Sequence, residues 1–265
     1  MDMAVCNSCN PTLRSHIFLC SFFFSYFVIA LYYFPLHANA LSFNITNINQ
    51  MFSDVNTIGA ASFSNDSIQI TPNKVTKAGQ ATYKDPFHLW DKAFGTLMDF
   101  NTYFLFVVDS EGNSIFADGL TFFLIPHDDP ISYNLGGCMG LPITETDPPT
   151  WTSFVAVEFD TSQNRWDTSK THVGININSL TSNKTAKWDP NITYGKENEA
   201  WISYNSSSKN LSVVFTGYVN NEKITNSLSF LVDLRDYLTE WVRIGFSAAT
   251  ASYSEKHIIK SWSFN

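Results

Sequence analysis

The chain has 265 residues, a formal net charge of −8 and four cysteines. This length allows one or two domains, and all-β sandwiches of about 200–250 residues commonly form a single one. An acidic chain without a basic run is a poor candidate for binding nucleic acid or anionic membranes.

The N-terminal segment, residues 1–40, is predicted to be a cleaved secretory signal peptide. Ile17 to Phe34 is an uncharged apolar run of 18 residues, and the small-residue sequence Ala38-Asn39-Ala40 follows it. That order of segments is typical of a signal peptide. The run is also long enough for an uncleaved membrane anchor, which is the alternative. We expect cleavage, no stable membrane insertion afterwards, and delivery to the extracellular space or the vacuole.

Cysteine content is informative about the mature chain, residues 41–265. Cys6, Cys9 and Cys20 leave with the signal peptide, so only Cys138 remains. A secreted domain with one cysteine has no internal disulfide, and a large apolar core must hold it together.

The mature chain is predicted to be β throughout. Segments rich in Val, Ile, Phe, Tyr and Trp alternate with short polar turns, and none shows a sustained 3.6-residue period. Asp233 to Thr239 allows at most one helical turn. This pattern predicts an all-β sandwich of antiparallel sheets. The expected strands are 103–108, 120–125, 154–159, 172–177, 200–204, 211–218, 227–232, 241–246 and 258–264. His88, His127 and His257 are isolated and are expected at the surface or in loops.

Six N-x-S/T sequons favour a glycosylated secretory product. Four lie between Asn183 and Ser212, so we expect that region to be exposed rather than part of a tight interface. The candidate acceptors are Asn44, Asn65, Asn183, Asn191, Asn205 and Asn210.

The stretch from Val155 to Ser179 gathers metal-ligand side chains. Glu158 and Asp160 share one face of a predicted strand, and His172 begins the returning strand. Carboxylate, amide and carbonyl oxygens suit Ca²⁺ at roughly 2.3–2.6 Å, whereas Glu and His suit Mn²⁺ or another transition metal. The alternative is a solvated acidic hairpin with a surface histidine. The candidate ligands are Glu158, Asp160, Ser162 through its carbonyl, Asn164, Asp167 and His172.

This stretch closely resembles the metal-binding hairpin of the legume (L-type) lectins. Five further segments resemble that family in the same order, and together they cover essentially all of residues 41–265. The matching segments are Leu41–Asn44, Asp85–Trp90, Ala117–Pro126, Gly136–Leu141, Val155–Ser179 and Trp241–Thr250.

The resemblance implies a plant protein of a single lectin domain with a concanavalin-like jelly-roll sandwich. It also implies Ca²⁺ and Mn²⁺ as cofactors, glycans or glycoproteins as partners, and a homodimer or homotetramer. Asp118, after a cis peptide bond, and Gly137 and Asn164 match the sugar-binding positions of the family. Ser252 and Tyr253 of the final loop are further candidates.

One position departs from the family pattern. Ser162 stands where these lectins commonly place a Phe or Tyr that stacks on the sugar. Aromatic stacking on a nucleic-acid base is worth roughly 1–3 kcal/mol, so its loss predicts about tenfold to a hundredfold weaker monosaccharide binding. Tyr253 or Trp166 could supply a replacement ring.

Three functional classes remain after this comparison. A secreted, metal-dependent lectin that recognises glycans without catalysis is the favoured interpretation. A lectin-like storage or defence protein that has lost monosaccharide binding is the alternative. A glycoside hydrolase is disfavoured, because Ser162 and Gln163 stand where such an enzyme would need its second carboxylate.

Overall fold

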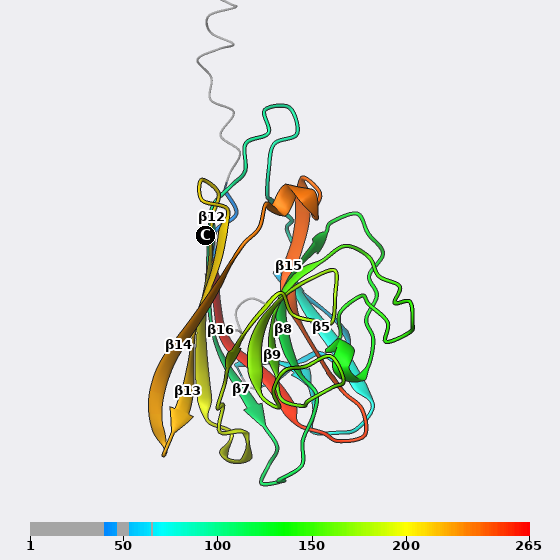
Figure 1. Cartoon of the computed structure of the whole chain (residues 1–265), viewed down its shortest axis with the longest axis vertical. Helices are drawn as coiled ribbons and strands as arrows, with labels where there is room; N and C mark the ends of the chain where they lie inside the picture. Colours follow the sequence, from blue (N-terminus) through cyan, green and yellow to red (C-terminus); the bar gives the residue numbers. More distant parts are fainter. Residues whose placement is uncertain (1–39, 47–52, 65) are drawn as a thin grey trace, which may run out of the picture. The chain divides into compact units, whose positions relative to one another are not determined.

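The structure is a computed structural model that describes residues 40–46, 53–64 and 66–265. Two antiparallel sheets of eight strands each pack face to face (Figure 1). The first sheet has the order β14 (Glu222–Leu231), β13 (Asn210–Val219), β12 (Glu197–Asn205), β7 (Phe100–Asp109), β16 (Lys256–Phe264), β4 (Ser67–Thr71) and β3 (Ser62–Ser64), with β1 (Phe43–Ile45) paired to β16. The second has the order β11 (Lys184–Lys187), β10 (His172–Ile177), β9 (Val155–Asp160), β8 (Gly119–Pro126), β15 (Trp241–Thr250), β5 (Lys77–Tyr83) and β2 (Val55–Gly59), with β6 (Phe87–His88) paired to β15.

An aromatic core fills the space between the sheets. The ring of Phe104 on β7 lies 4.9 Å from that of Phe246 on β15 and 5.7 Å from that of Phe159 on β9, measured between centroids. Trp262 on β16 contacts Phe246 from the first sheet, at 4.8 Å. Edge-to-face aromatic pairs of this kind add stability beyond the area they bury. A core of this type suits a domain whose cysteine, Cys138, is free.

The central strands of the second sheet are buried on both faces, unlike those of the first. Along β12 of the first sheet, buried and more exposed residues alternate, as expected of a strand with one face in solvent. All residues of β8, β9 and β10 are buried instead. The loops that follow β8 cover the outer face of this sheet, and they appear in green in Figure 1. A second apolar cluster lies under them, made by Phe123, Ile125, Cys138, Leu141, Ile143, Phe154, Ala156 and Leu180. Polar side chains on the outer face of β9 are therefore enclosed.

The predicted sandwich and its strands are confirmed. Each predicted strand overlaps an observed one, and the hairpin strand His172–Ile177 has the predicted bounds. The stretch Asp233–Thr239 contains only the short 3-10 helix η4 (Leu234–Asp236). Two other 3-10 helices, η2 (Gly136–Cys138) and η3 (Ile192–Tyr194), lie in loops.

The prediction for His257 was wrong. This side chain is fully buried on β16, with its Nδ1 atom 2.5 Å from Thr71 Oγ1 and its Nε2 atom 3.0 Å from Glu255 Oε1. β16 is a central strand of the first sheet, between β7 and β4. His257 therefore looks isolated in the sequence, but strands that are distant in sequence pair with β16 and enclose its side chain.

The sequons differ in accessibility. Asn44, Asn183 and Asn205 are exposed, whereas Asn191 and Asn210 are half-buried. The Nδ2 group of Asn191 donates to Asn221 Oδ1, and that of Asn210 donates to Ser212 Oγ. The expected exposure of this region therefore holds only in part. Asn65 lies outside the described residues.

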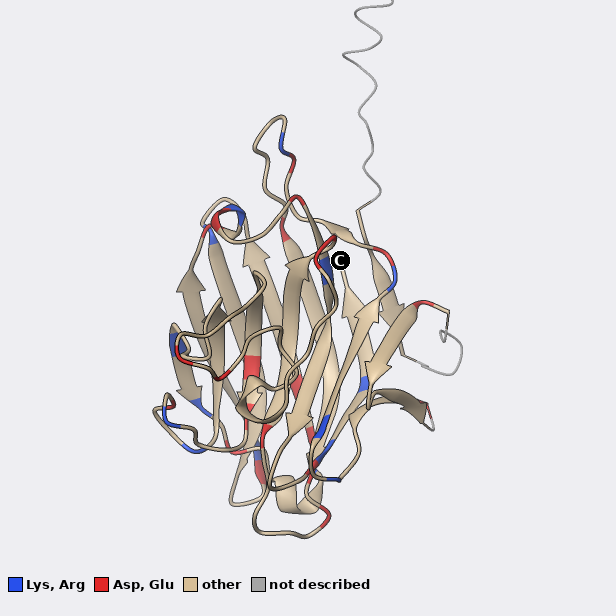
Figure 2. Ribbon diagram, turned by 90° about the vertical axis from the view of Figure 1, so that its right-hand side faces the viewer, with Lys and Arg blue, Asp and Glu red and all other residues tan. Residues whose placement is uncertain are grey.

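Charged side chains are dispersed in the part of the chain that the structure describes. Figure 2 shows blue and red segments intermixed over the loops and strands. Several form ion pairs at the surface, such as Lys260 with Glu197 at 2.7 Å and Lys256 with Glu111 at 2.9 Å. Exposed pairs contribute little to stability. Within residues 40–46, 53–64 and 66–265, no helix is long and apolar enough to cross a membrane. The predicted signal peptide, residues 1–40, lies almost entirely outside the described range.

Candidate functional site

The hairpin of β9 and β10 brings three ligand side chains together. Asp160 pairs with His172, and Glu158 pairs with Gly174 two residues further along. Because side chains alternate across a strand, Glu158, Asp160 and His172 share one face. One ligand atom from each lies within 4.8 Å of the others, and all three side chains are buried. His172 Nε2 is 3.0 Å from Glu158 Oε1.

The loop after β9 folds back toward this cluster. The backbone N–H of Ser162 donates to Asp160 Oδ1 at 2.7 Å, and that of Asn164 donates to Asp167 Oδ2 at 2.6 Å. Asp167 lies near enough to Asp160 for its charge to raise the pKa of the Asp160 carboxyl. The predicted metal ligands of the hairpin and of the loop are thus neighbours in space.

The electrostatics of this cluster favour a cation. Burial, and then the charges of Glu158 and Asp167, raise the pKa of Asp160 to about 10. Burial raises the pKa of Asp167 to about 6, against the hydrogen bond from Asn164. Burial lowers the pKa of His172, but its hydrogen bond and charge interaction with Glu158 outweigh this and raise it. A divalent ion between buried carboxylates that repel one another stabilises them as anions. The oxygen donors of this cluster fit Ca²⁺, and the imidazole nitrogen of His172 fits a second ion that accepts nitrogen.

Ser182 is a member of this site that sequence analysis missed. Its hydroxyl lies within hydrogen-bonding distance of Glu158 Oε1 and is 3.0 Å from Asn176 Oδ1. A Cβ atom on Gly174 would lie 2.2 Å from Ser182 Oγ and 2.5 Å from Glu158 Oε1, so this position requires glycine. Ser182 belongs to the turn after β10 and carries no motif that marks it in the sequence.

Three further predicted residues meet at the end of β9. The peptide bond between Ala117 and Asp118 is cis. The Asp118 carbonyl accepts from the Thr161 N–H at 3.1 Å, which holds this loop against the end of β9. A Cβ atom on Gly137 would lie 2.8 Å from both the Nδ2 and Oδ1 atoms of Asn164, so Gly137 and Asn164 are in direct contact.

Two buried acceptors at this corner lack partners. Asp118 Oδ2 and Asn164 Oδ1 are both buried, and neither has a hydrogen-bond partner among the described residues. Burial, followed by the charges of Glu255 and Glu145, raises the pKa of Asp118 to about 7, whereas a backbone hydrogen bond from Ala251 lowers it. Because buried polar groups normally find partners, such atoms indicate an ion or a ligand.

The two candidate replacement rings differ in their surroundings. The final loop reaches Asp118 through the backbone of Ala251, the residue before the candidates Ser252 and Tyr253. Tyr253 is about half exposed, at 51%. Trp166 packs against the second apolar cluster. Ser162 is half-buried and contributes its backbone N–H to Asp160.

Two more acidic residues near Asp118 escaped sequence analysis. Glu145 is exposed, and its Oε1 atom would lie 3.2 Å from a Cβ atom on Gly136. Glu255 is fully buried and accepts hydrogen bonds from His257 and from the hydroxyl of Thr161, which is 94 residues away in sequence. No local pattern links residues so far apart.

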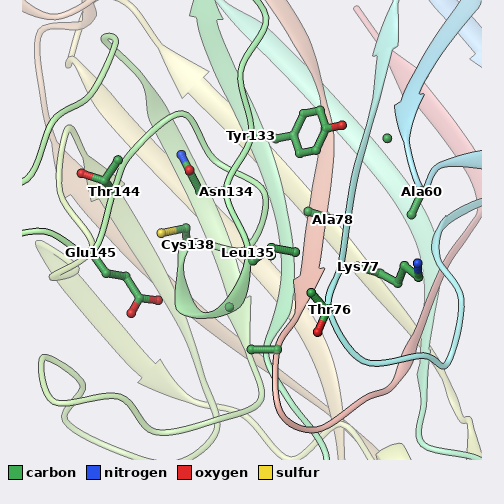
Figure 3. Close-up of a pocket in the computed structure, with 13 residues that line it drawn as sticks. Ala60, Thr76, Lys77, Ala78, Tyr133, Asn134, Leu135, Cys138, Thr144 and Glu145 are labelled. Carbon is green, nitrogen blue, oxygen red and sulfur yellow. The ribbon is translucent and has the colours of Figure 1, made fainter.

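A cavity of about 890 Å³ opens beside Gly136. Figure 3 shows Leu135 and Ala78 in the middle of its lining, with Glu145 on one side and Lys77 on the other. Tyr133 also lines it and is 42% exposed. The volume of this cavity falls in the range of cavities that bind small molecules.

Comparisons with known proteins agree with this arrangement. A family model described as a legume lectin domain matches residues 40–265. Lectin 9 of Medicago truncatula is 39% identical over 244 residues, which cover 87% of each chain. The Lotus tetragonolobus seed lectin superposes with a TM-score of 0.76 at 33% identity and covers 85% of this chain and 97% of that one. Winged bean acidic lectin complexed with methyl-α-D-galactose has the same TM-score at 34% identity and covers 84% and 97% of the two chains.

Proposed function

Because the chain belongs to the legume lectin family of carbohydrate-binding proteins, we propose that it is a secreted, Ca²⁺- and Mn²⁺-dependent lectin that recognises glycans without catalysis. One observation carries the proposal. Asp118, Gly137 and Asn164 meet at one corner, with unpaired buried acceptors, beside the cluster of Glu158, Asp160 and His172.

Two ions would occupy the acidic cluster. Asp160, Asn164, Asp167 and the carbonyl of Ser162 are the oxygen ligands that suit Ca²⁺. Glu158, Asp160, Asp167 and His172 suit Mn²⁺ or another transition metal, since one ligand is a nitrogen. When bound, the ions neutralise the carboxylates and stabilise the loop on which Asn164 sits. Ser182 would orient Glu158 from behind, through its hydroxyl.

The sugar would bind through acceptors and donors on opposite sides. An ionised Asp118 accepts from two adjacent hydroxyls, while the Gly137 N–H and the Asn164 amide donate to sugar oxygens. The galactoside bound to winged bean acidic lectin makes a neutral hexose a reasonable first ligand to test.

The alternative is a storage or defence protein of the same fold without monosaccharide binding. Ser162 supports it, because the corner lacks an aromatic ring at that position. A hydrolase finds less support, since the carboxylates of Glu158 and Asp160 are engaged with His172 and Ser162, and Ser162 and Gln163 stand where such an enzyme would need its second catalytic carboxylate.

Processing and assembly belong to the same proposal. We propose a signal peptide at residues 1–40, a lectin domain at 41–265, and glycans on the exposed Asn44, Asn183 and Asn205. The outer face of the first sheet carries partly exposed apolar side chains, among them Trp201 and Ile224. We propose a homodimer or homotetramer whose contacts leave Asn205 clear, because Asn205 lies on the same outward face of β12 as Trp201.

A glycan array tests the proposal. The mature protein is applied with Ca²⁺ and Mn²⁺, and again after treatment with EDTA. We expect binding to a restricted set of glycans that disappears with EDTA. Folded, ion-loaded protein that binds no glycan would favour the storage or defence alternative. Binding that persists in EDTA would place the site elsewhere.

Replacing Ser162 by Phe should strengthen monosaccharide binding. The new ring would lie beside Asn164 and supply the missing stacking surface, which predicts about tenfold tighter binding. Calorimetric titration with the best monosaccharide of the array measures the change. Thr168→Phe adds a ring to an exposed position in the same loop and is the control. Equal affinities for the wild type and Ser162→Phe would show that a ring at this position does not contact the sugar.

A further inference from the structure

A second cavity, of about 360 Å³, adjoins the one in Figure 3 and shares Thr144 and Glu145 with it. Three segments line it: the loop 143–151 after η2, residues 165–166 of the metal loop, and the turn 178–181 after β10. We call it the tryptophan cavity, because Trp151 and Trp166 are its aromatic walls. Its volume falls in the range of cavities that bind small molecules.

The walls of the tryptophan cavity combine indole rings with polar groups. Trp151 is 49% exposed, so part of its ring is open to a ligand. Trp166 is held in place, since it packs on the second apolar cluster and carries the Arg165 guanidinium 5.8 Å from its ring centroid. Asp147, Asn178 and Thr181 add polar groups to the lining.

This combination complements a pyranose ring. A neutral sugar has an apolar face of C–H groups and an edge of hydroxyls. Indole faces pack against the first, and carboxylate, amide and hydroxyl groups bond the second. A purely apolar ligand would take water away from the Asp147 carboxylate without replacing its hydrogen bonds, which costs free energy.

The tryptophan cavity lies near the corner at Asp118, because Glu145 lines the cavity and its charge acts on Asp118. Arg165 and Trp166 follow Asn164 directly, and the hydrogen bond from the Asn164 N–H to Asp167 closes the turn that holds them. On the other side, Glu145 lines the cavity and lies against Gly136, the neighbour of Gly137. A ligand longer than one sugar can therefore touch both places.

We propose that the tryptophan cavity is a second sugar subsite, which binds a further residue of a neutral oligosaccharide whose terminal residue occupies the corner at Asp118. The inference rests on the proposed lectin function and names its ligand class. Trp151 supplies, one sugar further along, the stacking that is absent at Ser162, while Trp166, fixed by the second apolar cluster, completes the wall of the cavity. The protein then binds oligosaccharides well and monosaccharides weakly.

The test uses a printed panel in which galactose, N-acetylgalactosamine, fucose, mannose and glucose appear alone and as the terminal residue of neutral di- to tetrasaccharides. The wild type, loaded with Ca²⁺ and Mn²⁺, should bind at least one oligosaccharide about tenfold tighter than its terminal monosaccharide. Trp151→Ala should lose this gain and keep its monosaccharide affinity, whereas Trp151→Phe should retain most of it.

Two additional variants guard against a folding artefact. Thr181→Trp fills the cavity from an exposed position and should also abolish the gain. Phe94→Ala removes an exposed ring, 83% accessible, from a loop that lines neither cavity, and should behave as the wild type.

The outcomes separate the two proposals. A gain that survives in both Trp151→Ala and Thr181→Trp, or a wild type that shows no gain over monosaccharides, overturns the subsite and leaves the lectin function intact. A folded wild type that binds nothing on the panel overturns both.

Discussion

Removing the bound ions is expected to lower the thermal stability of the protein strongly, and by more at pH 8 than at pH 5. An ion present at 100 times its dissociation constant stabilises the folded state by about 2.7 kcal/mol. Two such ions would raise the midpoint of unfolding by roughly 10 °C or more in a domain of this size. The carboxylates of the cluster must be ionised to bind them, so affinity falls in acid.

The pH dependence has opposite signs with and without ions. In the chain alone, the folded-state pKa values of Asp160, Asp118 and Asp167 are raised to about 10, 7 and 6. Each group takes up a proton on folding, so its contribution to stability is complete below pH 4 and is lost as the pH rises through the folded pKa. The pKa of His172 is also raised, which acts in the same direction. Stability in EDTA should therefore fall between pH 5 and pH 8.

Differential scanning calorimetry at pH 5, 6, 7 and 8, with the two ions or with EDTA, measures both effects. Asp160→Asn should remove most of the stabilisation by ions and flatten the pH dependence in EDTA. Asp128→Asn, on an exposed loop, is the matched control and should behave as the wild type. Unfolding midpoints that are the same with the ions and with EDTA at every pH would show that the cluster does not bind ions.

Replacing Asp118 by Asn is expected to abolish glycan binding, with a loss of at least a hundredfold. The amide has nearly the same size but carries no charge, and its NH₂ group donates where the carboxylate oxygen accepted from a hydroxyl. A hydrogen bond to a charged acceptor is worth about 1.5–3 kcal/mol, and its replacement leaves a buried donor facing a donor. The fold should remain, because Asp118 is buried and the substitution removes the cost of its charge.

Binding to the glycan array, with calorimetric titration of the strongest ligand, tests this expectation. A normal unfolding midpoint with ions present must accompany the loss, so that misfolding is not mistaken for a missing contact. Asp147→Asn, in the tryptophan cavity, is a second Asp-to-Asn change near the site and should spare monosaccharide binding. An Asp118→Asn protein that binds its glycans normally would remove this residue from the sugar site.

Sequence analysis predicted the cluster of Glu158, Asp160 and His172 because that part of the candidate site is local. β9 and β10 are joined by the single loop 161–171, so the alternation of Val155 to Asp160 and the position of His172 already indicate which side chains share a face. The strands were predictable for the same reason, since alternation and β-branched or aromatic residues act within a few positions.

Other parts of the site were beyond any local pattern. His257 was assigned to the surface, yet it is buried between Thr71, 186 residues away, and Glu255. Ser182 reaches Glu158 only because β10 and the turn after it fold back over β9. Trp166, a candidate to replace the missing ring, instead packs on the second apolar cluster.

The sequence by itself determined the β-sandwich class, the bounds of the acidic hairpin and the set of candidate ligand side chains, because these follow from periodicity and from chemistry close along the chain. The family resemblance had also assigned Asp118, Gly137 and Asn164 to one candidate site. Only the tertiary structure decided that Asn164 contacts Gly137, that Glu145 and Glu255 approach Asp118, and that Trp151 and Trp166 enclose a cavity. These contacts join loops at the ends of different strands. Their geometry follows from the register and packing of two whole sheets. The conformational preferences of short sequence segments do not determine it.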